Sequence, residues 1–359
     1  QAMKSHIIAL LYAVITCSST DGRQFLDPHN SYQDPVSSDA FNESKVHVTQ
    51  DSRHQPEYYG YEPTCPDAED IAPCVCTYVS EDNAMDLDCS AVESEDQLKQ
   101  IFKSYFPFKN FVLFIMHGNN SITVLEAGVF NGISFESIII YNTNLEVIEL
   151  QALDSCYETA WEIDVSNNMI TSFPFDELSQ FSKLSHFRIK KNSLSMIPAD
   201  AFNGLTALEL LYLDGNHANI VGTFKHLPSL SWIGLSSNDY SLTNYTIPTN
   251  FIKTGSSDLG YIDLHGNNIV SVEPDAFDIV EGLHIHMEHN ALSTLDEATW
   301  RPYLEAQVHL WAADNPLVCG CDIAWLFGED QLLEHVSTST TCTDGERLQD
   351  LDPKIFDLC

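Results

Sequence analysis

The histidines of this sequence are its first candidates for a metal or catalytic site. Five of the 14 histidines gather in one stretch, at His265, His284, His286, His289 and His309. Neutral imidazoles are common metal ligands, so the cluster could serve a metal-dependent enzyme. No H-E-x-x-H or similar motif fixes a ligand geometry. We therefore favour a solvated or pH-sensitive interface and keep metal binding as the alternative.

Ten cysteines form the second reactive group, and eight of them lie in two clusters. The clusters are Cys65, Cys74, Cys76 and Cys89, and Cys319, Cys321, Cys342 and Cys359. Such clustering predicts disulfides and an oxidising compartment, with three possible pairings in each cluster. Zinc is the rival interpretation, but the C-x-C spacing lacks the usual two-residue gap. Cys17 and Cys156 are left over.

Other catalytic motifs are missing from the sequence. There is no G-x-S-x-G, G-x-G-x-x-G, phosphate loop or C-x-x-C, and the carboxylates are scattered. Asp and Glu number 52 against 16 Lys and Arg, which gives a formal charge of −36. This acidity argues against nucleic acid and anionic membranes as partners, because both attract basic surfaces. We expect no enzyme activity, no cofactor and no bound metal.

The middle of the chain repeats. The string LELLYLDGN, which ends at Asn216, fits the pattern L-x-x-L-x-L-x-x-N, and eight similar strings surround it at spacings of 22 to 29 residues. Their last positions are Asn119, Thr143, Asn168, Asn192, Asn238, Asn267, Asn290 and Asn315. A second register of apolar residues, such as IPADAFNGL, follows each string. Both registers are typical of extracellular leucine-rich repeats.

The pattern predicts an α/β repeat fold, a leucine-rich-repeat solenoid with a parallel sheet on its concave side. Apolar residues at positions 1, 4 and 6 point inward, and the Asn at position 9 satisfies buried backbone groups. No repeat can bury its apolar face alone, so stacked neighbours share one core and the ends need caps. Cys156 occupies a position where other repeats carry Phe181 or Leu205, which predicts a core role.

Positions 2, 3, 5, 7 and 8 of each repeat should face outward on the concave sheet. Aromatic, basic and histidine residues collect there, which suits protein binding. We expect a binding face made of Trp161, Arg188, Lys190, Tyr212, Trp232, Tyr261, His284, His286, His309 and Trp311. His284 and His309 should be neighbours on adjacent strands. Arg188, Lys190 and Lys191 could receive an acidic partner or relieve acidic self-repulsion.

The boundaries between the segments of the chain follow from their composition. Ten apolar residues, 7–16, behind Lys4 predict a signal peptide over 1–20, and the polar stretch 21–63 predicts a flexible leader. A cysteine cap over 64–97, repeats over 98–316 and a second cap over 317–359 complete the chain. No other run approaches 18 apolar residues, so we expect a soluble secreted protein. We expect glycosylation at Asn42 and Asn244, but a buried, unmodified Asn119.

The first cap, CPDAEDIAPCVCTYVSEDNAMDLDCSAVESEDQLKQIF, resembles that of crustacean leucine-rich-repeat proteins typified by a non-catalytic luciferase subunit. AWEIDVSNNMI and NPLVCGCDIAWL are also similar to this family. The resemblance to capped secreted repeat proteins implies pairing of first with third and second with fourth cysteine. The implied pairs are Cys65–Cys76, Cys74–Cys89, Cys319–Cys342 and Cys321–Cys359.

The resemblance also implies a function. The chain would be a secreted, non-catalytic scaffold that binds and stabilises a small catalytic luciferase subunit, which oxidises coelenterazine. The alternative is a soluble extracellular recognition or adhesion protein that holds a protein or glycan ligand on its concave face. A metal-dependent enzyme that uses His284, His286 and His309 is the third hypothesis.

Overall fold

The computed structural model of this chain describes residues 64–359 apart from 80–83, 221–223, 240–243 and 329–330. The predicted signal peptide, the leader and the Asn42 sequon lie outside the described residues. Among the described residues, no helix is long and apolar enough to cross a membrane.

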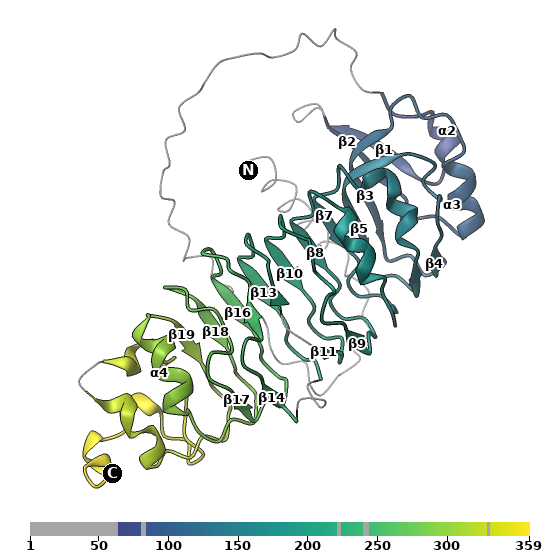
Figure 1. Ribbon diagram of the computed structural model, residues 1–359. Coiled ribbons are helices and arrows are strands. Elements are labelled where there is room, and N and C mark those ends of the chain that lie inside the picture. Colours follow the sequence, from purple (N-terminus) through teal and green to yellow (C-terminus); the bar gives the residue numbers. More distant parts are fainter. Residues whose placement is uncertain (1–63, 80–83, 221–223, 240–243, 329–330) are drawn as a thin grey trace, which may run out of the picture. The chain divides into compact units, whose positions relative to one another are not determined.

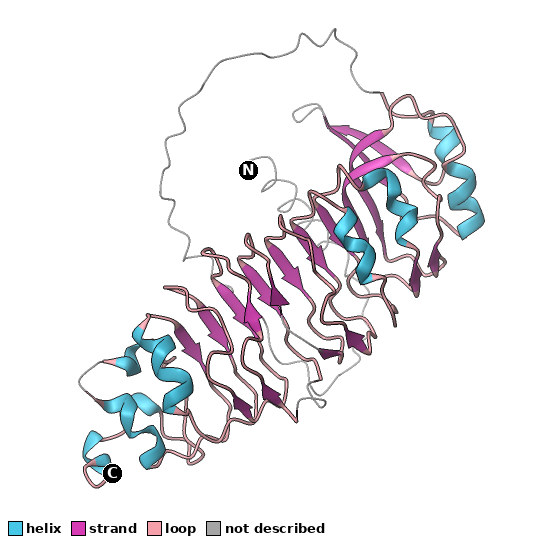
Figure 2. Ribbon diagram, in the orientation of Figure 1, coloured by secondary structure: helices cyan, strands magenta, loops and turns pink. Residues whose placement is uncertain are grey.

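One eleven-stranded sheet runs through the described residues, in the order β1-β2-β3-β5-β7-β8-β10-β13-β16-β18-β19 (Figures 1 and 2). Every pairing is parallel except that of β1 with β2. The strands are β1 Val75–Val79, β2 Ala84–Asp88, β3 Asn110–His117, β5 Ser134–Tyr141, β7 Glu162–Asp164, β8 His186–Arg188, β10 Leu210–Tyr212, β13 Trp232–Gly234, β16 Tyr261–Asp263, β18 His284–His286 and β19 His309–Trp311.

Each repeat also contributes a short segment across the core from the long sheet. Four two-stranded parallel sheets form there, from β4 Val124–Leu125 with β6 Val147–Ile148, β9 Met196–Ile197 with β11 Asn219–Ile220, β12 Phe224–Lys225 with β15 Ile252–Lys253, and β14 Thr246–Ile247 with β17 Ser271–Val272. Helical segments complete the repeats at η1 Leu150–Cys156, η2 Phe175–Gln180 and α4 Glu297–Glu305. The solenoid predicted from the repeats is therefore confirmed.

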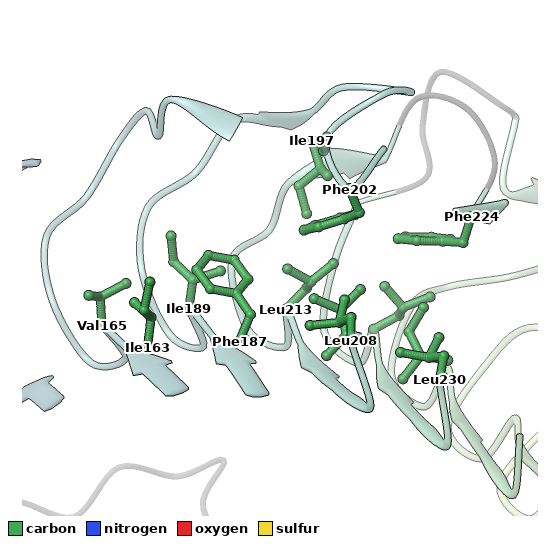
Figure 3. Packing of buried hydrophobic residues seen from close by; sticks show 14 of the residues in the cluster. Ile163, Val165, Phe187, Ile189, Ile197, Phe202, Leu208, Leu213, Phe224 and Leu230 are labelled. Atoms are coloured by element: carbon green, nitrogen blue, oxygen red, sulfur yellow. The ribbon is translucent and has the colours of Figure 1, made fainter. Parts of the chain in front are cut away.

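The core lies between these two layers. In Figure 3, Ile163, Phe187 and Leu213 extend from the long sheet, and Phe202 and Phe224 approach from the other side. The Phe202 and Phe224 rings stack with centroids 5.9 Å apart. Burial of one such side chain stabilises the fold by about 1.5–3 kcal/mol, and each repeat supplies several. The core therefore continues from repeat to repeat and fixes which side chains the sheet presents outward.

Asparagines at position 9 form a ladder along one edge of the core. Asn267 is completely buried, and its Nδ2 donates to the carbonyls of Leu235 and Leu264 at 3.1 and 2.7 Å. Its Oδ1 accepts the backbone N–H of Asn238 at 2.6 Å, so one side chain ties two repeats together. Thr143 replaces Asn in the second repeat and donates its hydroxyl to the Asn168 Oδ1 at 2.6 Å.

Disulfide-bonded caps close both ends. The structure pairs Cys65 with Cys76, Cys74 with Cys89, Cys319 with Cys342 and Cys321 with Cys359. The first cap holds α2 Ala68–Ile71, and α3 Glu95–Ile101 crosses the predicted boundary between this cap and the first repeat. The second cap holds η4 Cys321–Phe327, η5 Leu332–His335, η6 Leu348–Asp350 and η7 Pro353–Phe356. The first cap adds β1 and β2 to the long sheet, an extension that the repeat pattern does not reveal.

Candidate functional site

Five aromatic side chains form a continuous row on the open face of the long sheet, and we call them the ring row. They are Tyr212, Trp232, Tyr261, His286 and Trp311, and all are partly exposed. Successive ring centroids lie 5.9, 3.6, 4.4 and 5.0 Å apart. Because the rings hold one another in place, they have little conformational freedom left to lose when a partner binds.

At Gly234 the ring row changes from position 5 of one repeat to position 3 of the next. Tyr212 lies at position 5 of its repeat, but the next position 5 is Gly234, and the row crosses to Trp232 at position 3. The Asp214 carboxylate fills the space beside the glycine. A Cβ at position 234 would lie 2.5 Å from the Asp214 Oδ2. The Oδ1 of Asp214 accepts the Ser236 N–H at 3.0 Å and its hydroxyl at 2.8 Å.

Two cations lie against the Tyr212 end of the row. The Arg188 guanidinium carbon is 5.5 Å and the Lys190 Nζ is 5.2 Å from the ring centroid, within the range of cation–π attraction. Arg188 pairs with the buried Glu162, and Lys190 lies 3.7 Å from the Asp214 carboxylate. Burial raises the pKa of Asp214, and Lys190 opposes that rise.

These ion pairs bear on the prediction of an acidic partner. Arg188 and Lys190 neutralise carboxylates of this same chain, which leaves only Lys191 exposed among the three cations of that repeat. The arrangement favours the alternative, relief of acidic self-repulsion. The open face around Tyr212 is thus a surface of paired charges that surrounds aromatic rings.

Three imidazoles line up beside the other end of the ring row. His284 and His309 are lateral neighbours, as predicted, with ring centroids 4.8 Å apart, and His309 lies 5.3 Å from His335 of the second cap. The Trp311 Nε1 lies 3.2 Å from the His284 Nδ1 and donates to it. Sequence reasoning missed His335, because it lies beyond the repeats, where the repeat register gives no signal.

Burial and mutual repulsion both act on this histidine group. Burial lowers the pKa of His284, and the nearby His309 and His286 lower it further. Burial lowers the pKa of His309 too, with a second contribution from His335. At neutral pH the imidazoles of His284 and His309, beside the Trp311 end of the ring row, are therefore uncharged.

Each of the remaining histidines of the cluster contacts a carboxylate. His265 lies 2.8 Å from Asp263, His286 lies 3.0 Å from Glu288, and His289 lies 3.4 Å from Asp314. The hydrogen bond that the His265 ring donates to Asp263 raises the pKa of His265. In the part of the chain that the structure describes, no three His, Cys, Asp or Glu side chains converge to hold a metal ion. The geometry gives no support to the metal hypothesis.

One residue of the predicted binding face has to be corrected. Trp161 is only 7% exposed, and its ring packs edge-on against His186 at 5.2 Å. It stands at position 2, before the strand begins, and there its indole is covered by its neighbours. Trp161 is thus buried and does not belong to the exposed face. Seven other aromatic and histidine residues of the predicted face are partly exposed, namely Tyr212, Trp232, Tyr261, His284, His286, His309 and Trp311.

Comparisons with known proteins agree with the fold. Residues 182–239 match the family model described as Leucine rich repeat. Over 321 residues, the chain is 32% identical to the oplophorus-luciferin 2-monooxygenase non-catalytic subunit of Oplophorus gracilirostris. The match covers 81% of this chain and 87% of that subunit. The chain belongs to the leucine-rich-repeat family of this subunit.

Other members of the wider repeat class match in part. Toll-like receptor 9 of Mus musculus is 32% identical over 165 residues, which cover 45% of this chain and 15% of the receptor. Two solved structures share the fold at 22% identity and a TM-score of 0.52. The match to a chain of a TLR13–ssRNA13 complex covers 63% of this chain and 31% of that chain. The match to a chain of an octameric complex of Latrophilin 3, Unc5D and FLRT2 covers 69% of this chain and 76% of that chain.

Proposed function

We propose that this chain is the secreted, non-catalytic scaffold subunit of a luciferase complex. It binds and stabilises a small catalytic subunit that oxidises coelenterazine. The family relationship carries the proposal, because it spans 87% of a subunit that is itself named non-catalytic. The four disulfides support an oxidising, extracellular location for the complex.

The ring row is the seat that we propose for the catalytic partner. Rigid aromatic anchors surrounded by paired charges are the usual composition of the energetic centre of a protein interface. Trp232 and Trp311 are the largest side chains of the row, and they lie near its middle and at its end. Their edges offer apolar area at low entropic cost.

Size-exclusion chromatography with mass detection tests the subunit role. Protein from the native secretion is separated, and every fraction is assayed for light emission with coelenterazine. We expect light to travel with this chain in a complex larger than its own 40.2 kDa, and the isolated chain to be dark. If the chain elutes alone and all light lies elsewhere, the alternative of an extracellular recognition protein replaces the proposal.

Substitutions in the reconstituted complex test separately whether the ring row is the binding site of the catalytic partner. Trp232→Ala and Trp311→Ala should each weaken partner binding by at least about thirtyfold, the loss typical of an interface hot spot. Tyr105→Ala is the matched control, because Tyr105 is 77% exposed and lies in the loop between α3 and β3, far along the chain from the ring row. Equal affinities for all three variants would place the partner elsewhere on the chain.

A further inference from the structure

We infer that the mature protein carries an N-linked glycan on Asn244 and none on Asn119, although both asparagines lie in N-x-[ST] sequons. The two sequons are Asn244-Tyr245-Thr246 and Asn119-Asn120-Ser121. The sequon motif alone does not distinguish them as acceptors, and from the sequence only the repeat register predicts that Asn119 is buried. The structure distinguishes them directly, because it places one asparagine amide in solvent and the other inside the ladder of the repeats.

The side-chain amide of Asn119 is buried and fully hydrogen-bonded, so it cannot accept a sugar. It is 4% exposed, and its Nδ2 donates to the carbonyls of Ser90 at 2.9 Å and Val92 at 2.7 Å. Both hydrogens of that amide nitrogen are therefore used, and the nitrogen faces the first cap. Its Oδ1 accepts the N–H groups of Ser121 and Ile122 at 2.8 and 3.0 Å. A sugar on this nitrogen would separate the first repeat from its cap.

Asn244 has the opposite environment. Its side chain is exposed, and both Asn244 and Tyr245 adopt left-handed backbone angles, with φ of 53° and 58°, in a turn just before β14. The turn belongs to the longest spacing between repeats, 29 residues from Asn238 to Asn267. β14 pairs with β17 in its own two-stranded sheet, not in the long sheet. A glycan there leaves the ring row open.

The surface beside Asn244 gives a second reason for a glycan. Tyr245 and Val270 are 38% and 44% exposed, and the Val270 N–H donates to the Tyr245 carbonyl at 2.8 Å. The backbones of these two residues are thus joined, and each carries an exposed apolar side chain. A bulky, solubilising sugar on the preceding residue would cover them.

The reaction is a transfer from a lipid-linked oligosaccharide diphosphate in the lumen of the secretory pathway. The Asn244 Nδ2 bonds to the anomeric carbon of the first sugar and loses one proton. The bond between that carbon and the lipid diphosphate breaks, and the diphosphate leaves with the electron pair. The disulfides of this chain form in the same compartment, so a correctly bonded chain has been exposed to the transferase.

The full chain, fused behind a host secretion signal in insect cells, tests the inference by mass spectrometry of its peptides. All samples carry Asn42→Gln, which removes the third sequon. Non-reducing analysis first confirms the four disulfides, so an unmodified asparagine cannot be attributed to failed secretion. We expect a peptide glycan at Asn244 that peptide N-glycosidase releases, and an unmodified Asn119 peptide.

Matched variants complete the test. Thr246→Ser keeps the sequon and should keep the glycan, whereas Asn244→Gln should lose the shift in mass and precipitate at lower concentration. Ser121→Ala destroys the other sequon and leaves Asn119 in place. It should not change the mass of attached glycan. An unmodified Asn244, or a glycan at Asn119, in disulfide-bonded protein overturns the inference. Equal solubility of Asn244→Gln and Thr246→Ser overturns the covering role of the sugar.

Discussion

At the scale of single residues, Cys156 shows how a reactive group becomes inert in this fold. Its side chain is fully buried, and its Sγ accepts the Phe135 N–H at 3.3 Å. Burial raises the pKa of the thiol to about 11. Because the thiolate is the reactive form, and because no reagent reaches the sulfur, the thiol should not react in the native state.

We therefore predict that iodoacetamide leaves Cys156 unmodified in the native protein at about pH 8, near the ordinary thiol pKa. After unfolding in denaturant with the disulfides intact, the same thiol should be alkylated completely. Peptide mapping of the two samples measures both states. Rapid alkylation of Cys156 in native protein would contradict its assignment to the core, and it would mean that the residue is an accessible, reactive thiol.

The lowered pKa values of His284 and His309 predict a pH-dependent stability. A base whose folded pKa lies below its unfolded value, about 6.5, is favoured in its neutral form by folding. As the pH falls below about 6.5, the unfolded chain takes up protons first, so stability decreases until the folded imidazoles titrate as well. The double variant His284→Gln/His309→Gln should lose less stability between about pH 6.5 and about pH 5 than the unsubstituted chain.

Denaturant midpoints at the two pH values measure this effect. His265→Gln is the control with opposite sign, because Asp263 raises the pKa of His265 and its stabilisation is present at acid pH. That contribution should be lost as the pH rises through the folded pKa of His265. If the double variant and the unsubstituted chain lose equal stability on acidification, the two histidines are not the groups responsible.

The repeat register predicted all five residues of the ring row, and its failure at Trp161 has a physical cause. Position 3 correctly placed Trp232 and Tyr261 on the outer face, because side chains alternate along a strand. Position 2 precedes the strand, so the same rule failed for Trp161. The stacking geometry could not be predicted, since the row passes from position 5 at Tyr212 to position 3 at Trp232, and a repeat pattern does not specify contacts between different positions.

At the scale of elements, the position-9 ladder holds neighbouring repeats together. We predict that Asn119→Ala lowers the free energy of unfolding by about 2–3 kcal/mol, because two carbonyls and two N–H groups lose their partner. Asn120→Ala, one residue along and exposed, should change it by less than about 0.5 kcal/mol. Urea unfolding of both variants measures the difference. Equal effects would mean that the ladder contributes little at this end.

The caps could be predicted only in part. Their cysteines and their need to cover the core follow from the sequence, because an open end of a solenoid exposes apolar residues. The hairpin of β1 and β2 does not follow, since its residues carry no repeat pattern. At the other end, the backbone of Ser337 donates to Leu310 of β19 at 2.8 Å, a contact over 27 residues that spacing cannot specify.

At the scale of the whole molecule, the charge of −36 and the ring row act at different stages of binding. A long-range field changes how often a charged partner meets the chain. The short-range contacts of aromatic edges and paired charges form only once the two proteins have met. These contacts therefore govern the dissociation rate of the complex. Affinity measured alone would mix the two contributions, whereas rate constants separate them.

We therefore predict that raising the salt concentration from about 0.05 M to about 0.5 M changes the association rate of the catalytic partner and leaves its dissociation rate almost constant. Trp232→Ala should do the reverse, with faster dissociation and an unchanged salt dependence of association. Surface-based kinetics on the reconstituted complex measures both rates. A dissociation rate that rises steeply with salt would show that ion pairs hold the partner. The ring row would then stabilise the sheet and would not be the binding site.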